Sequence, residues 1–425
     1  MKLLIKQGRF VDPVGGDGGI ADILIENGKV TVIGTDLEEP GAQVIDARNM
    51  VVCAGLIDMH VHLREPGFEY KETIETGCAA AARGGFTAIA CMPNTKPVID
   101  TPELVEYVRE QAQKACGVQV LPIAAVSVGQ KGQELTNMDA LASANVIALS
   151  DDGVPIQNAN LMRDALIRAR RLKLPVLSHC EDAEMVQNYA VNEGSVSRRL
   201  GIPGRPAIAE ELMVVRDAML AEETGSAVHI CHVSTARSVD IVRNYKKRGV
   251  RITCETCPQY FTLTEDEVLA QGTMARVNPP LRTPKDVEGI IEGLLDGTID
   301  AIVTDHAPHS AEEKARPLTE APSGMVGLET SLAVTLTALY HSGKMDLDAI
   351  VSKMTVEPAR ILGMEKGRLS IGSDADIVIF DPNEEWIVDP EQFASKGRNT
   401  PFGGRKLKGK VKYTIVGGNV IYQDQ

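Results

Sequence analysis

The chain has 425 residues, of which 44% are hydrophobic and 24% charged, so it can bury a large core and is not an intrinsically disordered chain. Its 44 Lys and Arg stand against 58 Asp and Glu, and the net charge of -14 argues against general binding to nucleic acid or to a membrane surface. A small-molecule site is therefore favoured. Eight scattered cysteines, no signal-peptide pattern and no run of about 18 apolar residues predict reduced thiols in a cytoplasmic protein.

The first 54 residues alternate apolar and polar positions and turn at glycines, which is typical of a small β-unit. Strands are expected over Lys2–Phe10, Asp22–Glu26 and Lys29–Ile33, with a turn at Asn27 and Gly28.

From about Gly55 to Met364, short apolar strands alternate with segments whose apolar residues recur three and four positions apart, the helical period. Eight strands are expected, over Leu56–Met59, Phe86–Cys91, Val118–Val126, Val146–Leu149, Pro175–Ser178, Ala227–Cys231, Val250–Cys254 and Ala301–Thr304. Helices are expected over Thr101–Lys114, Asn160–Leu172 and Ala209–Thr224. Eight parallel strands with crossover helices fit a (β/α)8 barrel as well as an open doubly wound sheet.

The segment from His306 to Met325 is rich in charge and proline and is expected to be a loop, which beside a site is often a lid. The last 60 residues return to the β-rich character of the N-terminus. Strands are expected there over Asp376–Phe380, Trp386–Val388 and Lys410–Val416.

Seven of the eight histidines lie in short segments, most of them directly after an expected strand. Side chains at the carboxyl ends of parallel strands converge on one face, where ligands bind. His60 and His62 are two residues apart on a strand, so both imidazoles point to the same side and can bind a metal ion at two points. Later strand ends add His179, His232 and Asp305, which supply nitrogen and oxygen ligands suited to Zn²⁺.

Two further features bear on this metal site. His229 lies three residues before His232, hence on the opposite strand face, and is expected to be structural. The SDDG segment at residues 150–153 is either an ordinary turn or the source of a carboxylate that bridges two metal ions. Two nearby cations repel each other, and only one of the adjacent Asp151 and Asp152 can readily lie between them.

The motifs HVHLREPG, ACMPNTKP, SDDG, HICHVST, NPPLR, TDHAPH and VGLET together resemble dihydroorotases of the long, bacterial type, within the amidohydrolase superfamily. The resemblance covers essentially the whole chain. It implies an α/β fold, a (β/α)8 barrel over residues 55–365, with residues 1–54 and 366–425 as two parts of a small β-sandwich. It also implies a zinc-dependent cyclic amidase that interconverts N-carbamoyl-L-aspartate and L-dihydroorotate in pyrimidine biosynthesis.

Carried over position by position, the resemblance implies about two zinc ions per chain. The implied metal ligands are His60, His62, Asp152, His179, His232 and Asp305. Many superfamily members bridge their metals with a carbamylated lysine, but SDDG offers none, so an aspartate bridge is implied, with Asp152 preferred over Asp151. Asp305 is also the implied catalytic residue, which moves a proton to the leaving amide nitrogen.

The resemblance also implies substrate contacts with an amide and carboxylate ligand. These fall on His62, Arg64, Asn94, Asn278, His309, Ser323 and Gly324. Arg64 suits the substrate carboxylate, because a guanidinium binds it with two parallel hydrogen bonds. Ser323 stands where most relatives have an apolar aromatic residue.

Two alternatives stay open. The CETCPQY block at Cys254–Tyr260 looks more like hydantoinases, which keeps a hydantoinase- or allantoinase-type cyclic amidase as the alternative. Such a substrate has no carboxylate to bind, so the presence of Arg64, Asn94 and His309 favours dihydroorotase. The other is a silent scaffold for aspartate transcarbamoylase, which the six intact ligands disfavour. Besides a small-molecule substrate, a homodimer or an association with aspartate transcarbamoylase is compatible with the resemblance.

Overall fold

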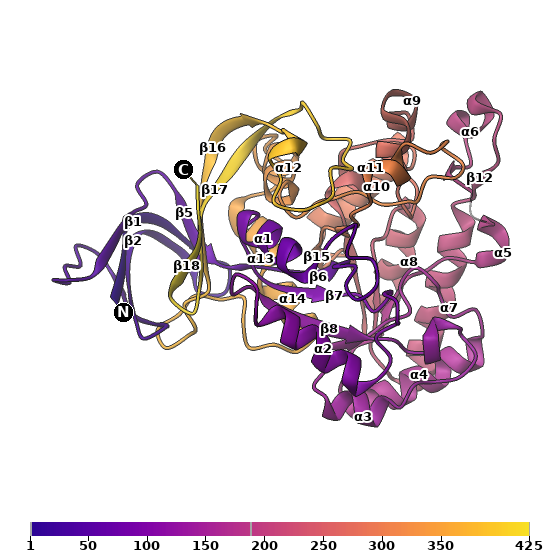
Figure 1. The fold of residues 1–425 in the computed structure, drawn as a ribbon, viewed down its shortest axis with the longest axis horizontal. Helices are drawn as coiled ribbons and strands as arrows, with labels where there is room; N and C mark the ends of the chain where they lie inside the picture. The colour runs from indigo at the N-terminus through magenta and orange to yellow at the C-terminus, as the bar shows by residue number, and fades with distance from the viewer. Residues whose placement is uncertain (1, 188, 425) are drawn as a thin grey trace.

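The computed structural model describes residues 2–187 and 189–424, without the side chains of residues 16–18. Met1 and Gln425, the ends of the predicted terminal segments, lie outside the described residues. Figure 1 shows a sheet at one end of the molecule and a larger α/β unit at the other.

The larger unit is a closed barrel of eight parallel strands. They are β6 (Leu56–Val61), β7 (Phe86–Cys91), β8 (Gln119–Ala124), β9 (Ala148–Leu149), β10 (Leu177–Ser178), β13 (Val228–Ile230), β14 (Ile252–Thr256) and β15 (Ala301–Ile302). Ladders join β6 to β9 and β10 to β15, while bridges from Leu149 to Val176 and from Val61 to His306 close the ring. The predicted (β/α)8 barrel is confirmed, and the open sheet is excluded.

Burial explains why the barrel strands read as apolar runs rather than as alternating patterns. All six residues of β6 and all six of β7 are buried, because helices cover the outside and side chains fill the inside. The helices are α1 (Ile74–Arg83), α2 (Pro102–Ala112), α3 (Met138–Ser143), α4 (Ala159–Leu172), α7 (Ile208–Thr224), α8 (Ala236–Lys247), α10 (Pro284–Leu295), α13 (Leu347–Met354) and α14 (Val356–Leu362). The three predicted helices match α2, α4 and α7 within two residues at each end.

The smaller unit is one sheet built from both chain ends. Its strands are β1 (Lys2–Asp12), β2 (Gly16–Glu26), β3 (Lys29–Gly34), β4 (Gln43–Asp46), β5 (Val51–Ala54), β16 (Ile377–Ile387), β17 (Lys406–Val416) and β18 (Asn419–Gln423). The two ends of the chain meet where β5 pairs with β16, with Val52 opposite Ile379. The sheet surrounds a small apolar core of its own that includes Ile5, Ile23 and Ile377.

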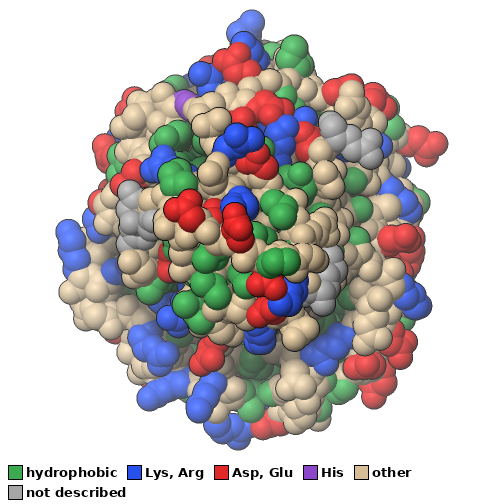
Figure 2. All heavy atoms as spheres, turned by 90° about the vertical axis from the view of Figure 1, so that its left-hand side faces the viewer, with side chains coloured by type: hydrophobic (Ala, Val, Ile, Leu, Met, Phe, Trp, Pro, Cys, Tyr) green, Lys and Arg blue, Asp and Glu red, His purple; other side chains and the backbone are tan. Residues whose placement is uncertain are grey.

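The two predicted strands Asp376–Phe380 and Trp386–Val388 are parts of one strand, β16. Its pairing with β17 shifts register between Asp381 and Glu385, and this irregularity interrupts the alternation that marks a strand. The face of the molecule at the sheet end carries interspersed acidic, basic and hydrophobic side chains (Figure 2). None of the helices in the described ranges is long and apolar enough to span a membrane.

The segment expected as a loop from His306 to Met325 contains a short helix, α11 (Ala311–Lys314). Ser310 caps this helix in a reciprocal capping box with Glu313. The buried Lys314 Nζ then donates to the carbonyls of Thr273, Arg276 and Pro322 at 2.9, 3.3 and 3.0 Å. The segment therefore lies fixed over the barrel mouth rather than extending into solvent.

Candidate metal centre

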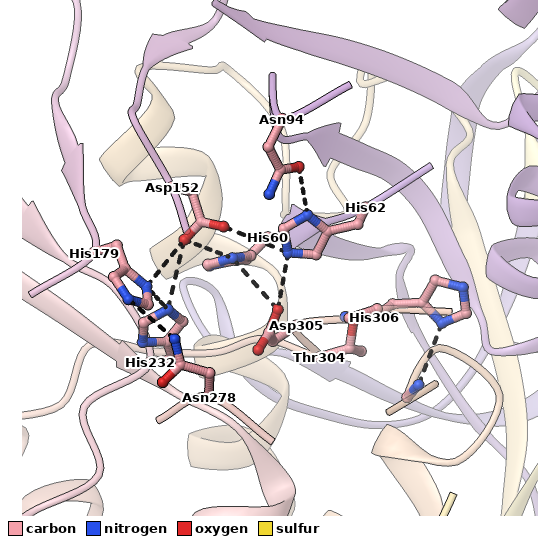
Figure 3. Close-up of polar contacts among 12 residues, drawn as sticks. His60, His62, Asn94, Asp152, His179, His232, Asn278, Thr304, Asp305 and His306 are labelled. Atoms are coloured by element: carbon pink, nitrogen blue, oxygen red, sulfur yellow. Dashed lines mark hydrogen bonds and ion pairs between the residues drawn. The ribbon is translucent and has the colours of Figure 1, made fainter. Parts of the chain in front are cut away.

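Side chains from five strand ends meet at the mouth of the barrel (Figure 3). The six predicted ligands, all buried, are His60 in β6, His62 just after it, Asp152 after β9, His179 after β10, His232 after β13 and Asp305 after β15. The structure thus brings together every residue for which the sequence predicts a metal-binding role.

Asp152 lies at the centre of this cluster. Its Oδ1 is 3.5 Å from His60 Nε2, 3.4 Å from His179 Nδ1 and 3.5 Å from His232 Nε2. Its Oδ2 is 3.5 Å from His62 Nε2. These separations are long for hydrogen bonds, but two ligands of one tetrahedral zinc ion lie about 3.4 Å apart. The spacing of the ligand atoms therefore fits shared metal ions.

Unpartnered atoms provide an independent test of the fit. His60 Nε2 and Asp152 Oδ1 are buried without a hydrogen-bond partner, which is costly unless a ligand satisfies them. Among the described residues, potential ligand atoms within 4.8 Å of one another form three groups: His60, His62 and Asp305; Asp152, His179 and His232; and His60, Asp152 and Cys231. The first two groups share no residue, and their nitrogen and carboxylate donors would suit a pair of zinc-class ions. Asp152, which faces imidazoles of both groups, would be the carboxylate that the two ions share.

The adjacent aspartates face different surroundings. Asp151 Oδ1 accepts from the backbone N–H groups of Val126 and Ser127 at 2.8 and 3.1 Å, and the Ser127 hydroxyl donates to Oδ2. Burial outweighs these hydrogen bonds and raises the pKa of Asp151 to about 6. Burial opposes ionisation of Asp152 too, but the charge of His60 and the nearby imidazoles of His179 and His232 hold its pKa well below the usual value. Only Asp152 reaches the cluster.

Sharp turns of the backbone aim two of the ligands across the barrel mouth. His232 and Asp305 adopt φ values of 33° and 48°, a left-handed conformation that non-glycine residues rarely take. Asp305 Oδ1 consequently lies 3.0 Å from His62 Nε2 and 3.6 Å from His60 Nε2. Such local strain is concentrated at functional sites.

Glu255 in β14 supports the cluster from inside the barrel, and the sequence analysis missed it. His60 Nδ1 donates to Glu255 Oε1 at 2.6 Å, which leaves Nε2 to face Asp152. The other Glu255 oxygen lies 3.1 Å from His229 Nε2, so His229 contacts this carboxylate and not the ligand groups. Burial opposes ionisation of Glu255, but the charge of His60 and these hydrogen bonds lower its pKa to about 2. The available signal was a charged residue inside an apolar barrel strand.

Beside the cluster lies a cavity of about 420 Å³. It is lined by all seven predicted substrate contacts, which are His62, Arg64, Asn94, Asn278, His309, Ser323 and Gly324. Arg64 Nε donates to the Pro308 carbonyl at 3.2 Å, and Arg64 Nη2 lies 3.4 Å from His309 Nε2. His309 Nε2 donates to the Ser323 carbonyl at 2.9 Å. Burial and the nearby charges of Arg64 and Lys71 lower the pKa of His309 well below its usual value, so the imidazole is neutral.

The two amide side chains of the cavity lie against different ligands. Asn94 Oδ1 accepts from His62 Nδ1 at 2.9 Å, whereas Asn278 Nδ2 is 3.4 Å from His179 Nε2. Arg205 donates to Asn278 Oδ1 and, at 2.7 Å, to Glu181 Oε1. The sequence analysis did not find Glu181 or Arg205, which also line the cavity. Glu181 follows His179 by two residues, the spacing of His60 and His62, but Arg205 comes from outside the barrel strands and gives no such signal.

Comparisons with known proteins agree with this geometry. The family described as Dihydro-orotase-like matches residues 49–238, and the Amidohydrolase family matches residues 293–422. The dihydroorotase of Pelotomaculum thermopropionicum is 54% identical over 100% of this chain and 99% of its own length, and that of Acetivibrio thermocellus is 50% identical over 100% and 99%. Among solved structures, the L-hydantoinase of Arthrobacter aurescens has a TM-score of 0.88 at 26% identity, covering 99% of this chain and 96% of its own.

Proposed function

The chain belongs to the dihydroorotase family of the amidohydrolase superfamily, and on that premise we propose that it interconverts L-dihydroorotate plus water with N-carbamoyl-L-aspartate, using two zinc ions per chain. Membership of this family makes the protein a hydrolase that acts on cyclic amides. The metal identity, the number of ions and the roles of individual residues are the substance of the proposal.

The metal ligands of this proposal are His60, His62, Asp152, His179, His232 and Asp305. When bound, zinc lowers the pKa of water towards 7 and polarises a carbonyl as a Lewis acid. Asp305 is the proton carrier, because its carboxylate faces both the ligand cluster and the cavity. It accepts the proton released as water adds to the ring carbonyl and returns it to the leaving amide nitrogen.

Arg64 beside His309 is the observation that carries the choice of substrate. A guanidinium on the wall of a metal-ligand cavity is suited to a substrate that has a carboxylate next to its amide ring. The neutral His309 adds no second positive charge but offers a hydrogen-bonding ring beside it. Hydantoin has no carboxylate, so a hydantoinase substrate would leave Arg64 without a substrate carboxylate to bind.

The test is hydrolysis of four cyclic amides by the zinc-loaded protein. We expect a much higher kcat/KM for L-dihydroorotate than for dihydrouracil, hydantoin or allantoin. If hydantoin is the better substrate, the hydantoinase alternative replaces the proposed activity. If the zinc-loaded protein hydrolyses none of the four, the scaffold alternative gains support.

A further inference from the structure

The connection between β16 and β17, residues 388–405, leaves the flanking sheet and runs over the barrel (Figure 1). Two of its polar side chains are almost fully buried, with exposed fractions of 1% for Ser395 and 2% for Asn399. Ser395 Oγ donates to Glu72 Oε2 at 2.5 Å, and the same oxygen accepts from His306 Nε2 at 3.2 Å. A segment of the sheet unit therefore packs against the end of the eighth barrel strand.

Asn399 uses its whole side-chain amide on backbone groups at the edge of the cavity. Oδ1 accepts from the His309 N–H at 3.0 Å, while Nδ2 donates to the carbonyls of Ala307 and Gly324 at 3.1 and 3.0 Å. The Asn399 carbonyl accepts from the Val326 N–H at 2.9 Å. One acceptor and two donors at this reach are the chemistry of an asparagine side chain.

These backbone groups belong to the part of the cavity wall that would face the carboxylate of the proposed substrate. Residues 307–309 present His309 to the cavity, and the Pro308 carbonyl between them accepts from Arg64 Nε. Gly324 lies where the segment over the barrel mouth returns, and an added Cβ there would be 2.8 Å from Ala307 Cβ. Asn399 thus connects the two ends of the segment 306–325, at Ala307 and at Gly324.

We propose that Asn399 is a positioning residue that sets the preference for a ring bearing a carboxylate, by holding the backbone on which Arg64 and His309 rest. The inference rests on the proposed function and deepens it. None of the four hydrogen bonds of Asn399 named above goes to a metal-ligand candidate, so its replacement affects carboxylate recognition while the metal ions stay bound.

Asn399→Asp keeps the shape of the side chain but turns both donations into contacts between oxygens. Asn399→Ala removes the amide without adding charge and provides a second variant if the first does not fold. Thr400→Val is the matched control, because Thr400 is buried in the same segment and its hydroxyl contacts Phe402 N–H rather than the cavity wall. For each zinc-loaded protein, kcat and KM are measured with L-dihydroorotate and with dihydrouracil, together with bound zinc.

We expect both Asn399 variants to lower the ratio of kcat/KM for dihydroorotate over dihydrouracil by at least about tenfold, with KM for dihydroorotate rising and the zinc content unchanged. The ratio is measured on one preparation, so a smaller folded fraction cancels. Equal losses on both substrates, or an equal fall in the Thr400→Val control, would overturn this inference alone. A wild-type protein without preference for dihydroorotate would overturn the proposed function, and this inference with it.

Discussion

Two adjacent aspartates after β9 have different surroundings, although they are neighbours in the sequence. Asp151 accepts three hydrogen bonds from Val126 and Ser127, which makes it part of the barrel wall. Asp152 faces four imidazoles instead, with no hydrogen-bond partner at Oδ1. Neighbouring residues at a strand end point in opposite directions, so the chain can place only one of them between two cations.

We predict that Asp152→Asn lowers kcat by more than about a hundredfold and reduces bound zinc, because an amide carries no charge to bridge two cations. Asp151→Asn is the matched control and should keep zinc, since Asn Oδ1 can still accept from the two backbone N–H groups. Kinetics and elemental analysis of both variants make the comparison. Bicarbonate should not activate the enzyme; recovery of apo protein only with bicarbonate and zinc together would indicate a carbamylated lysine instead.

We predict that Arg64→Met lowers kcat/KM for dihydroorotate by about 10- to 100-fold and changes that for dihydrouracil much less, because one charge-assisted hydrogen-bonding partner of the carboxylate is lost. Arg198→Met is the control, as Arg198 in the short helix α6 (Ser195–Leu200) is exposed. Steady-state kinetics with both substrates decide. Equal losses on the two rings would mean that Arg64 supports the fold only.

Candidate site residues could be predicted from the sequence where a metal-binding or charged side chain lies at the end of a predicted strand. The six ligand candidates and Arg64 lie in or just after barrel strands and within recognisable motifs, so spacing and resemblance together find them. Asn399, Arg205 and Glu255 could not be found in this way. Arg205 lines the cavity from the short strand β12 (Gly204–Arg205), whereas Asn399, in a sheet connection, bonds the backbone at the edge of the cavity. Glu255 acts through His60. Their roles depend on which distant segments pack together.

At the scale of elements, the barrel strands could be predicted from their apolar runs, whereas several short or irregular strands could not. The four-residue strands β4 and β5 are too short to show a period, and the register shift hides the continuity of β16. Strand β15 ends at Ile302, two residues before its predicted end, and the chain then turns sharply at Asp305. The end of β15 was therefore predicted wrongly at a point where the backbone is irregular and carries a candidate site residue.

The titratable side chain of Glu329 connects the start of α12 (Ser331–Thr335) to the segment between β16 and β17. Glu329 lies just before this helix, and its carboxylate accepts from the N–H groups of Ala394 and Ser395 at 3.0 and 3.2 Å. The side chain is 4% exposed, and burial raises its pKa to about 7 despite Arg83 at 3.4 Å. The folded state therefore binds this proton more tightly than the unfolded chain, so its contribution to stability is full below about pH 4.5 and is lost as the pH rises to about 7.

We predict that the wild type loses about 2 to 3 kcal/mol of unfolding free energy relative to Glu329→Gln between pH 4.5 and 7.5, because a glutamine has no proton to lose. Urea unfolding of both proteins across this range measures the difference. Other titrating groups are common to both and cancel. A wild type that instead gains on the variant with rising pH would show that Arg83 holds the carboxylate ionised.

At the scale of the whole molecule, the candidate metal centre is the place where residues from distant parts of the barrel meet across its mouth. His60 near the start of the barrel and Asp305 near its end come together with Asp152 from the middle, in a buried cluster that includes unpartnered atoms of His60 and Asp152. A ligand that binds only the folded state stabilises it by about 2.7 kcal/mol at a hundred times its dissociation constant. Metal binding at this cluster would therefore stabilise the folded state.

We predict that the purified protein holds about two zinc ions and that chelation lowers both activity and the melting temperature, with zinc restoring both. Two of the three ligand groups share no residue, which makes a sharper test possible. His179→Ala removes a ligand from the group of Asp152, His179 and His232 only, so the zinc content should fall to about one ion per chain while the group of His60, His62 and Asp305 keeps its own. His341→Ala, outside the site with its Nε2 bonded to the Pro382 carbonyl, should keep both ions. Loss of both ions in His179→Ala would mean that the two positions fill only together, and an apo protein with full activity would remove the metal from the proposed chemistry altogether.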